Sequence, residues 1–156
     1  MSAIVIYSSQ SNNTKKVAEV VAEEMGCEAK PVAEAGDISS FDIVAVGFWY
    51  KAGQPDTASQ EFLATLAGKN VFQFGTHGAA VGTPPADKGM AKAKELAAGA
   101  TVIGTFSCPG EVAEKVLEMA AKKDPQPPWL AAAPAAKGHP DAADLAAAKA
   151  AVKAAL

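Results

Sequence analysis

Short apolar runs and amphipathic segments of helix length alternate along the first 122 residues, and this alternation constrains the fold more than any other feature. The runs predicted to be strands are Ala3–Tyr7, a weaker one at Glu28–Val32, Phe41–Gly47, Val71–Gly75 and Thr101–Phe106. The segments predicted to be helices are Thr14–Met25, Thr57–Leu66, Asp87–Ala98 and Glu111–Lys122. Strands joined through helices by short connections pair in parallel, with helices on both faces of the sheet. The sequence therefore predicts an α/β fold with a doubly wound, five-stranded parallel sheet of order 2-1-3-4-5.

The last part of the chain, residues 123–156, has a different composition. Prolines and alanines interrupt it first, so we expect a linker rather than a helix there. A helix-forming stretch follows, with Pro140 expected at its first position and Asp141 and Asp144 near its positive end. We expect residues 1–122 to form the domain and residues 123–156 to add a linker and a final helix packed on it. A frayed or partner-docking tail is the alternative, because the only large apolar residues of this helix are Leu145, Val152 and Leu156.

Composition excludes several classes of function. The net charge of −3 disfavours nucleic acid as a partner. No apolar run is long enough to span a membrane and no secretory signal is visible, so we expect a cytoplasmic protein. The two cysteines, Cys27 and Cys108, have no metal-binding spacing and are expected to be free thiols. All 14 basic residues are lysine, so any phosphate must be bound by backbone N–H groups, hydroxyls, amides or a lysine.

Polar and aromatic residues are concentrated in the four loops that follow strand ends. In a doubly wound sheet these carboxyl ends form the ligand-binding edge. The loops are Ser8–Asn13, Phe48–Pro55, Thr76–Pro85 and Ser107–Gly110.

The first of these loops is unusually polar, with seven small polar residues from Ser8 to Thr14. It opens a helix, whose N-terminal N–H groups attract anions. A helix cap accounts for one or two such residues but not for seven. The loop matches neither the nucleoside-triphosphate nor the dinucleotide glycine pattern, so it predicts a monophosphate site.

The stretch IVIYSSQSNNTKKVAE resembles the flavodoxin signature, in which a strand runs into T/S-x-T/S-G-N-T and then a helix. On this resemblance Ser9, Ser11, Asn13 and Thr14 occupy the positions that hold the FMN phosphate. Gln10 and Asn12 depart from the pattern, and Asn12 is tolerable in place of glycine if its backbone is left-handed.

The resemblance extends along the chain. FDIVAVGFWYKAG and VFQFGTHGAAVG resemble the two strands and loops that contact the flavin in flavodoxins. The GFW stretch ending at Asp56, together with the late HPD of residues 139–141, is also similar to a small group of flavodoxin-like proteins. The resemblance implies a flavodoxin-like fold with FMN as cofactor.

The second loop carries the aromatic pair Trp49 and Tyr50, at least one of which we expect to contact the flavin, Trp49 in preference. Covering the end of the sheet is the alternative role. The third loop has no aromatic, which differs from flavodoxins and leaves one flavin face open. Lys51 and His77 would stabilise a reduced, anionic flavin, whereas a solvated charge and a loop hydrogen bond are their alternative roles. For Cys108 a buried apolar role is preferred over lining the flavin edge.

The full set of residues predicted to contact FMN combines all four loops. It is Ser9, Gln10, Ser11, Asn12, Asn13, Thr14, Phe48, Trp49, Tyr50, Lys51, Gly53, Thr76, His77, Gly78, Ala79, Cys108 and Gly110.

An FMN-binding electron carrier that serves redox partner proteins, as a monomer or weak dimer, is the function that the resemblance implies. No catalytic base or nucleophile is needed for it, and no metal is expected. An FMN-dependent reductase of a quinone or other small molecule is the alternative, favoured by the open flavin face. A phosphorylated receiver domain shares the fold but needs acidic residues where this chain has Tyr7–Ser8 and Phe48–Trp49, so that interpretation fails.

Overall fold

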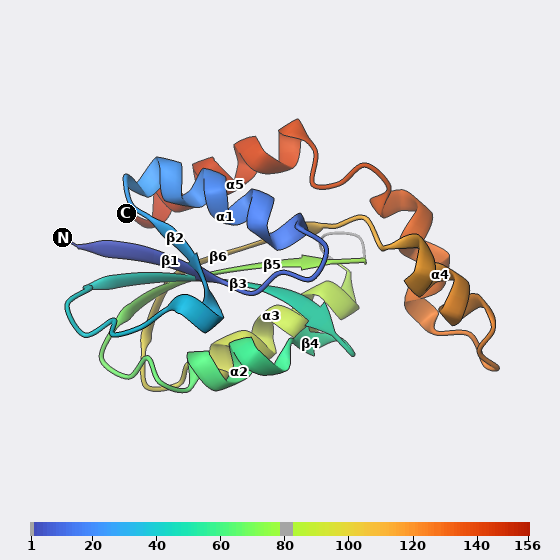
Figure 1. The fold of residues 1–156 in the computed structure, drawn as a ribbon, viewed down its shortest axis with the longest axis horizontal. Coiled ribbons are helices and arrows are strands. Elements are labelled where there is room, and N and C mark those ends of the chain that lie inside the picture. Colours follow the sequence, from blue (N-terminus) through green and yellow to red (C-terminus); the bar gives the residue numbers. More distant parts are fainter. Residues whose placement is uncertain (1, 79–82) are drawn as a thin grey trace.

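The computed structural model describes residues 2–78 and 83–156 (Figure 1). Its parallel strands are β1 (Ala3–Tyr7), β2 (Ala29–Pro31), β3 (Ile43–Lys51), β5 (Asn70–His77) and β6 (Thr101–Pro109). They pair in the order β2-β1-β3-β5-β6, and every neighbouring pair is parallel. The predicted fold class and strand order are confirmed. The two-residue strand β4 (Gln54–Pro55) adds an antiparallel pairing to β3 that the sequence did not suggest.

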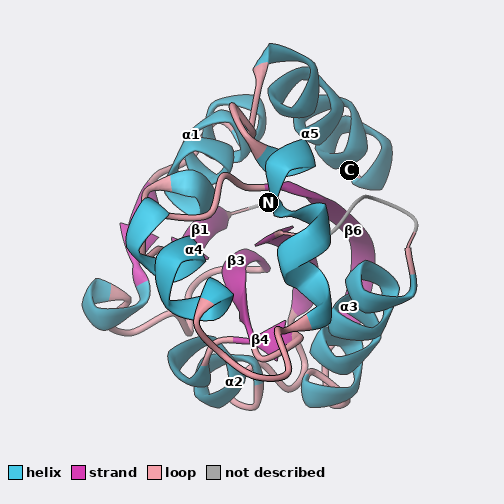
Figure 2. Cartoon of the chain, turned by 90° about the vertical axis from the view of Figure 1, so that its right-hand side faces the viewer, coloured by secondary structure: helices cyan, strands magenta, loops and turns pink. Residues whose placement is uncertain are grey.

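Helices cover both faces of the sheet (Figures 1 and 2). The α-helices are α1 (Asn13–Met25), α2 (Thr57–Leu63), α3 (Pro84–Leu96), α4 (Glu114–Ala121) and α5 (Ala142–Ala155). Two 3₁₀ helices, η1 (Val32–Glu34) and η2 (Pro128–Ala136), complete the set found in the described residues. Helices α1 and α5 cover one face, and α2 and α3 cover the other. None of the helices described is both long and apolar enough to cross a membrane.

Each face has its own apolar core, built by the alternation of side chains along the strands. On the α1 face, Val17 and Val21 pack on Val5 and Phe72, and all four are almost completely buried. On the other face the core includes Ile6, Val46 and Phe48. Each such side chain contributes about 1.5–3 kcal/mol through burial. These two cores fix the sheet and so fix the edge at which its loops meet.

Three strands run further than the sequence predicted. β3 continues through the aromatic pair to Lys51, β5 reaches His77, and β6 reaches Pro109. The pairing continues as far as Trp49↔Thr76 and His77↔Pro109. Polar character was used to predict where the loops begin. Aromatic and β-branched residues favour paired strands, however, and cross-strand pairing extends the strands into those stretches. Part of the predicted site therefore lies on rigid strands.

A two-residue turn, Ala52–Gly53, joins β3 to β4. Both residues have positive φ, 53° and 79°, as the tight hairpin turn that matches strand twist requires. Alanine is strained in this conformation, whereas asparagine and glycine tolerate it. The turn thus carries a local strain that substitution can remove.

We expect Ala52→Asn to raise the free energy of unfolding by about 1 kcal/mol. Urea denaturation followed by circular dichroism would measure it, with Ala52→Val as the opposite control because β-branched residues resist positive φ. Equal stability of the two variants would show that the turn is not strained.

Residues 110–141, which we call the end segment, lie beyond the carboxyl ends of the strands rather than on a face of the sheet. Figure 1 places α4 past the end of β5, and Figure 2 shows it in front of the strands when that edge is viewed. Helix α4 packs against η2. The helix predicted over Glu111–Lys122 thus exists in shortened form, and η2 occupies part of the predicted linker.

The final helix packs on α1, and its start differs from the prediction. Asp141 is the N-cap and forms a capping box with Asp144, so the helix begins at Ala142 and Pro140 lies outside it. Asp144 N donates to Asp141 Oδ1 and Asp141 N donates to Asp144 Oδ2, and these reciprocal bonds fix the start of the helix at Ala142. Val152 is buried against the sheet and Leu156 is exposed.

His139 makes the stability contributed by this helix cap depend on pH. Its Nδ1 lies 2.5 Å from Asp144 Oδ2, and this hydrogen bond raises the pKa of His139. A raised pKa in the folded state adds stability below the unfolded value of about 6.5, and this is lost as pH rises through the folded pKa.

We therefore expect the stability difference between the wild type and His139→Gln to be larger at pH 5.5 than at pH 8.5. Because the His139 side chain is 27% exposed, the change is about 0.5 kcal/mol. Chemical denaturation of both proteins at the two pH values would measure it, and a difference that grows with pH would contradict the assignment.

Candidate functional site

The seven polar residues Ser8–Thr14 run from the end of β1 into the start of α1, and in the structure they fall into two groups. Ser8, Ser9, Asn13 and Thr14 make side-chain hydrogen bonds within the protein. Gln10, Ser11 and Asn12 are exposed, and their side chains bond to none of the described residues. Hydrogen bonds within the protein thus occupy the side chains of the outer four residues, and the side chains of the middle three remain available to a ligand.

The outer residues tie the loop to its neighbours. Ser8 Oγ donates to Asp56 at 2.7 Å, and Thr14 Oγ1 lies 2.8 Å from Thr76 Oγ1 in a buried pair. Asn13 Nδ2 donates to the Glu111 carbonyl at 2.9 Å. Three hydrogen bonds thus join the loop after β1 and the start of α1 to the residue after β4, to the end of β5 and to the segment after β6, and they fix the position of the loop.

The middle of the loop opens the helix with its N–H groups exposed to solvent. Asn12 adopts the left-handed conformation, φ 68°, that the replacement of glycine required. Its side chain does not cap α1; among the described side chains only Ser9 bonds to this turn, accepting from Lys15 N at 3.3 Å. A helix start with this single side-chain acceptor favours an anion.

A hollow of about 360 Å³ lies beside this loop. Its lining comes from the end of β1, the first loop and the chain after β2: Tyr7, Ser8, Ser9, Asn12, Lys15, Pro31, Val32 and Ala33. This volume falls in the range of small-molecule sites. Lys15 supplies a cation at its edge, so donors and positive charge meet at one place.

The aromatic pair of β3 is split between the two faces of the sheet. Phe48 is completely buried, so its side chain is enclosed in the core. Tyr50 lies on the same face, stacked with Phe48 at 6.0 Å, and its hydroxyl donates to the Ala86 carbonyl. Trp49 points to the opposite face and is half-buried. Tyr50 is half-buried too, but its ring packs against Phe48 and His77, so Trp49 stays the candidate of this pair for contact with a planar ligand.

The other two residues of the second loop that were predicted to contact FMN, Lys51 and Gly53, are exposed. Lys51 ends β3 and Gly53 completes the hairpin turn. Both lie further along the chain than Trp49, at the tip of the hairpin.

The end of β5 is held rigidly. Thr76 is buried against Thr14, and the buried ring of His77 lies 4.9 Å from that of Tyr50. Gly78 follows and is half-buried, whereas Ala79 lies outside the described residues. His77 thus packs among side chains beneath the edge of the sheet.

The end of β6 joins the core to the end segment. Cys108 is buried, and burial, followed by the charges of Asp144 and Asp141, raises its pKa to about 12. Gly110 N donates to the His77 carbonyl at 2.8 Å, and a Cβ on Gly110 would lie 2.8 Å from Asn13 Nδ2. Gly110 is therefore needed for close packing against the first loop.

Two titratable groups near this edge are held neutral. Burial, with a smaller effect of Asp87, raises the pKa of Tyr50, so the phenol stays protonated and donates its hydrogen bond. Cys108 likewise stays a thiol at neutral pH, and a thiol is a poor nucleophile. Neither group is therefore an activated nucleophile.

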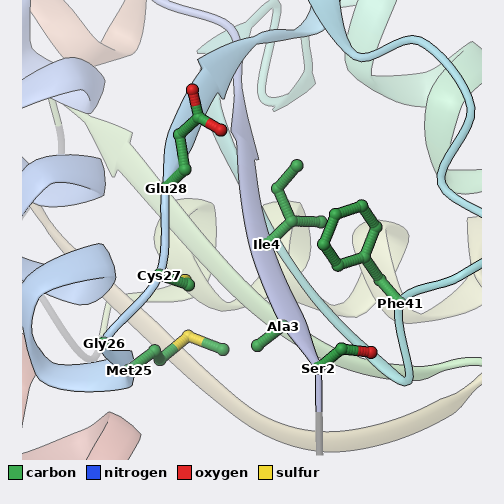
Figure 3. Close-up of a pocket in the computed structure, with 8 residues that line it drawn as sticks. All are labelled: Ser2, Ala3, Ile4, Met25, Gly26, Cys27, Glu28 and Phe41. Carbon is green, nitrogen blue, oxygen red and sulfur yellow. The ribbon is translucent and has the colours of Figure 1, made fainter.

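A second hollow, of about 310 Å³, lies at the opposite end of β1 (Figure 3). Its walls are mostly apolar, and they include Ile4, Met25, Phe41 and the half-buried thiol of Cys27, whose pKa is raised by burial. It is distant from the loops that follow the strands and is not part of the candidate site.

Sequence reasoning missed Lys15, Asp56 and Glu111. Asp56 was detectable, since an aspartate directly before a helix is a typical N-cap, and it accepts from Ser59 N at 3.3 Å. Lys15 lies within the predicted helix Thr14–Met25, where an exposed lysine is ordinary and carries no signal of its own. The role of Glu111 lies in its backbone carbonyl, which no side-chain pattern reveals.

Comparisons with known proteins identify the family of this fold. Residues 4–153 match a family described as the flavodoxin domain. The chain is 30% identical over 128 residues to the flavodoxin-like domain-containing protein BilS of Clostridioides difficile, covering 73% of this chain and 69% of BilS.

Two solved structures illustrate the likeness in fold. A flavoprotein of Lactobacillus acidophilus in complex with FMN has a TM-score of 0.56 and 22% identity, covering 68% of this chain and 92% of that one. A flavodoxin of Streptococcus pneumoniae has a TM-score of 0.55 and 19% identity, covering 94% and 99%.

Proposed function

The chain belongs to the flavodoxin family, and we propose that it binds FMN at the carboxyl edge of the sheet and transfers electrons between redox proteins. Bound FMN supplies the redox centre, and the protein positions it and controls access to it. FMN is the cofactor that family membership implies, and the related flavoprotein of Lactobacillus acidophilus was solved with it.

The observation that carries the proposal is the group of exposed polar residues at the start of α1. The side chains of Gln10, Ser11 and Asn12 bond to none of the described residues, and Lys15 lines the same hollow as Asn12. With backbone N–H groups at the same helix start, they form a phosphate site that needs no arginine. Trp49 is the aromatic that we assign to the flavin ring.

Both cysteines are free, which suits the proposed cytoplasmic location. An FMN-dependent reductase is the alternative function, and the same experiment separates the two.

The test begins with the visible spectrum of the purified protein after incubation with FMN and removal of free flavin. Retained flavin absorbance with quenched fluorescence is expected, and its absence would refute the proposal. The holoprotein is then mixed with NADPH and a quinone. An electron carrier consumes NADPH only when a reductase protein is added, whereas steady consumption without one would assign the reductase function.

A further inference from the structure

We propose that the exposed face of α4 is the docking surface for an electron-transfer partner whose own surface is apolar at its centre and acidic around it. This inference rests on the proposed function, because it names the kind of partner that approaches the site.

The apolar part of the surface is Val116 and Met119. Among the described residues, the large apolar side chains that remain exposed are these two and Leu156, with 40%, 67% and 62% of their surface accessible. Val116 and Met119 are three residues apart and so share one side of the helix. Exposed apolar side chains gathered on one side of a helix are typical of an interaction site.

The charged part of the surface is basic. Lys115 and Lys122 are four residues before and three after Met119, so helix geometry places both beside it. Neither forms an ion pair with any described residue. Glu118 is three residues after Lys115 and four before Lys122, so it lies beside both lysines but about 100° around the helix from Met119, and Glu114 lies about 140° from Met119. The positive charge is therefore confined to the side of the lysines that borders Met119.

The lysines favour a partner with acidic residues around its apolar centre. The protein as a whole is acidic, with net charge −3, and would repel an acidic protein at long range. The unpaired lysines beside Met119 reverse that preference locally, and rim charges of this kind determine which partner associates.

The position of α4 connects the surface to the site. The end segment begins at Gly110, bonded to His77, and Asn13 of the first loop holds the Glu111 carbonyl. Only two residues separate Glu111 from the start of α4. Figure 2 shows α4 in front of the carboxyl ends of the strands, so a partner on α4 lies at the same edge as the proposed flavin.

The test measures electron transfer from the reduced FMN protein to two forms of cytochrome c at low ionic strength. Native cytochrome c is basic, and succinylation of its lysines makes it acidic without changing the haem. Each ferric haem takes up one electron, so one fully reduced flavin reduces two cytochromes. A neutral quinone serves as a small acceptor that needs no docking.

We expect the double variant Lys115→Glu with Lys122→Glu to slow the reaction with succinylated cytochrome c about 10-fold. The matched control, Lys94→Glu with Lys153→Glu, changes the net charge equally on exposed lysines of α3 and α5 and is expected to slow it less than 2-fold. Equal slowing by both pairs would overturn the proposal, because net charge alone would then explain it.

The apolar part is tested separately. Met119→Ser is expected to slow the same reaction several-fold, whereas Leu156→Ser, on the exposed end of the chain, leaves it unchanged. If sedimentation shows that the wild type dimerises and Met119→Ser is monomeric, the surface binds a second copy and the proposed partner is wrong.

The reaction with the quinone separates a failure of the proposed function from a failure of the docking surface. All variants are expected to reduce it at the wild-type rate. A wild-type protein that retains no FMN would refute the proposed function, whereas normal quinone reduction with unaltered cytochrome rates would refute the docking surface alone.

Discussion

Replacing Gly89 with alanine is expected to lower the free energy of unfolding by about 2 kcal/mol, although alanine is the better helix former. Gly89 lies within α3 and faces Tyr50. A Cβ there would lie 2.2 Å from Tyr50 Cε2 and 2.8 Å from its hydroxyl oxygen. Helix propensity alone predicts that Gly89→Ala raises the free energy of unfolding by about 1 kcal/mol. The sign of the observed change therefore depends on whether the Tyr50 ring can move away from the new methyl group.

Three contacts hold the Tyr50 ring in place, which is why the clash outweighs propensity. Its hydroxyl donates to Ala86, Phe48 stacks on it, and the His77 ring lies 4.9 Å from it. Moving the ring would break that hydrogen bond and disturb the core.

Denaturant unfolding of four proteins would measure this: the wild type, Gly89→Ala, Tyr50→Leu and the double variant. In the Tyr50→Leu background we expect Gly89→Ala to be neutral or stabilising by up to about 1 kcal/mol. The same loss in both backgrounds would show that the ring is not the obstacle.

Gly89 also illustrates what the sequence did not reveal. A glycine inside an amphipathic helix indicates close packing, but nothing in the sequence names Tyr50 as the neighbour. The aromatic pair was expected to lie at the open edge, whereas pairing of β3 with β5 continues to Trp49 and directs Tyr50 beneath α3. Side-chain alternation along a strand would have separated the pair, had the strand been extended to Lys51.

The order of strands was predictable because each strand is a short apolar run and each connection obeys simple handedness rules. The position of α4 was not. Amphipathicity tells which side of a helix is apolar but not what that side contacts, and in α4 the apolar residues Val116 and Met119 remain exposed. The turn at Ala52–Gly53 was missed because alanine is not a residue that signals a left-handed turn.

The first loop was the most informative stretch of the sequence. An excess of polar residues beyond the needs of a helix cap predicted a ligand, and the structure divides them into four bonded and three exposed residues. Which residue belongs to which group depends on contacts with Asp56, Thr76 and Glu111. Those partners lie 48, 62 and 98 residues away in sequence, so a local pattern could not reveal them.

Ser11→Asp is expected to weaken FMN binding about 100-fold while leaving the fold intact. Ser11 is exposed and bonds to no described residue, so its replacement removes no structural contact. Two unit charges about 4 Å apart repel by about 4 kcal/mol at an effective dielectric constant of about 20. Solvent at an exposed loop reduces this to about 2.7 kcal/mol, which corresponds to 100-fold.

Riboflavin, which lacks the phosphate, separates this mechanism from a general disturbance of the site. Fluorescence titration of the apoprotein with FMN and with riboflavin gives both affinities. Ser11→Asp should weaken FMN binding and leave riboflavin binding unchanged, whereas Ser40→Asp, an exposed serine at the opposite end of the sheet, should affect neither. If FMN and riboflavin weaken equally, the aspartate disturbs the ring site instead. Because only the phosphate differs between the two ligands, a selective loss of FMN would place that phosphate at the loop between β1 and α1.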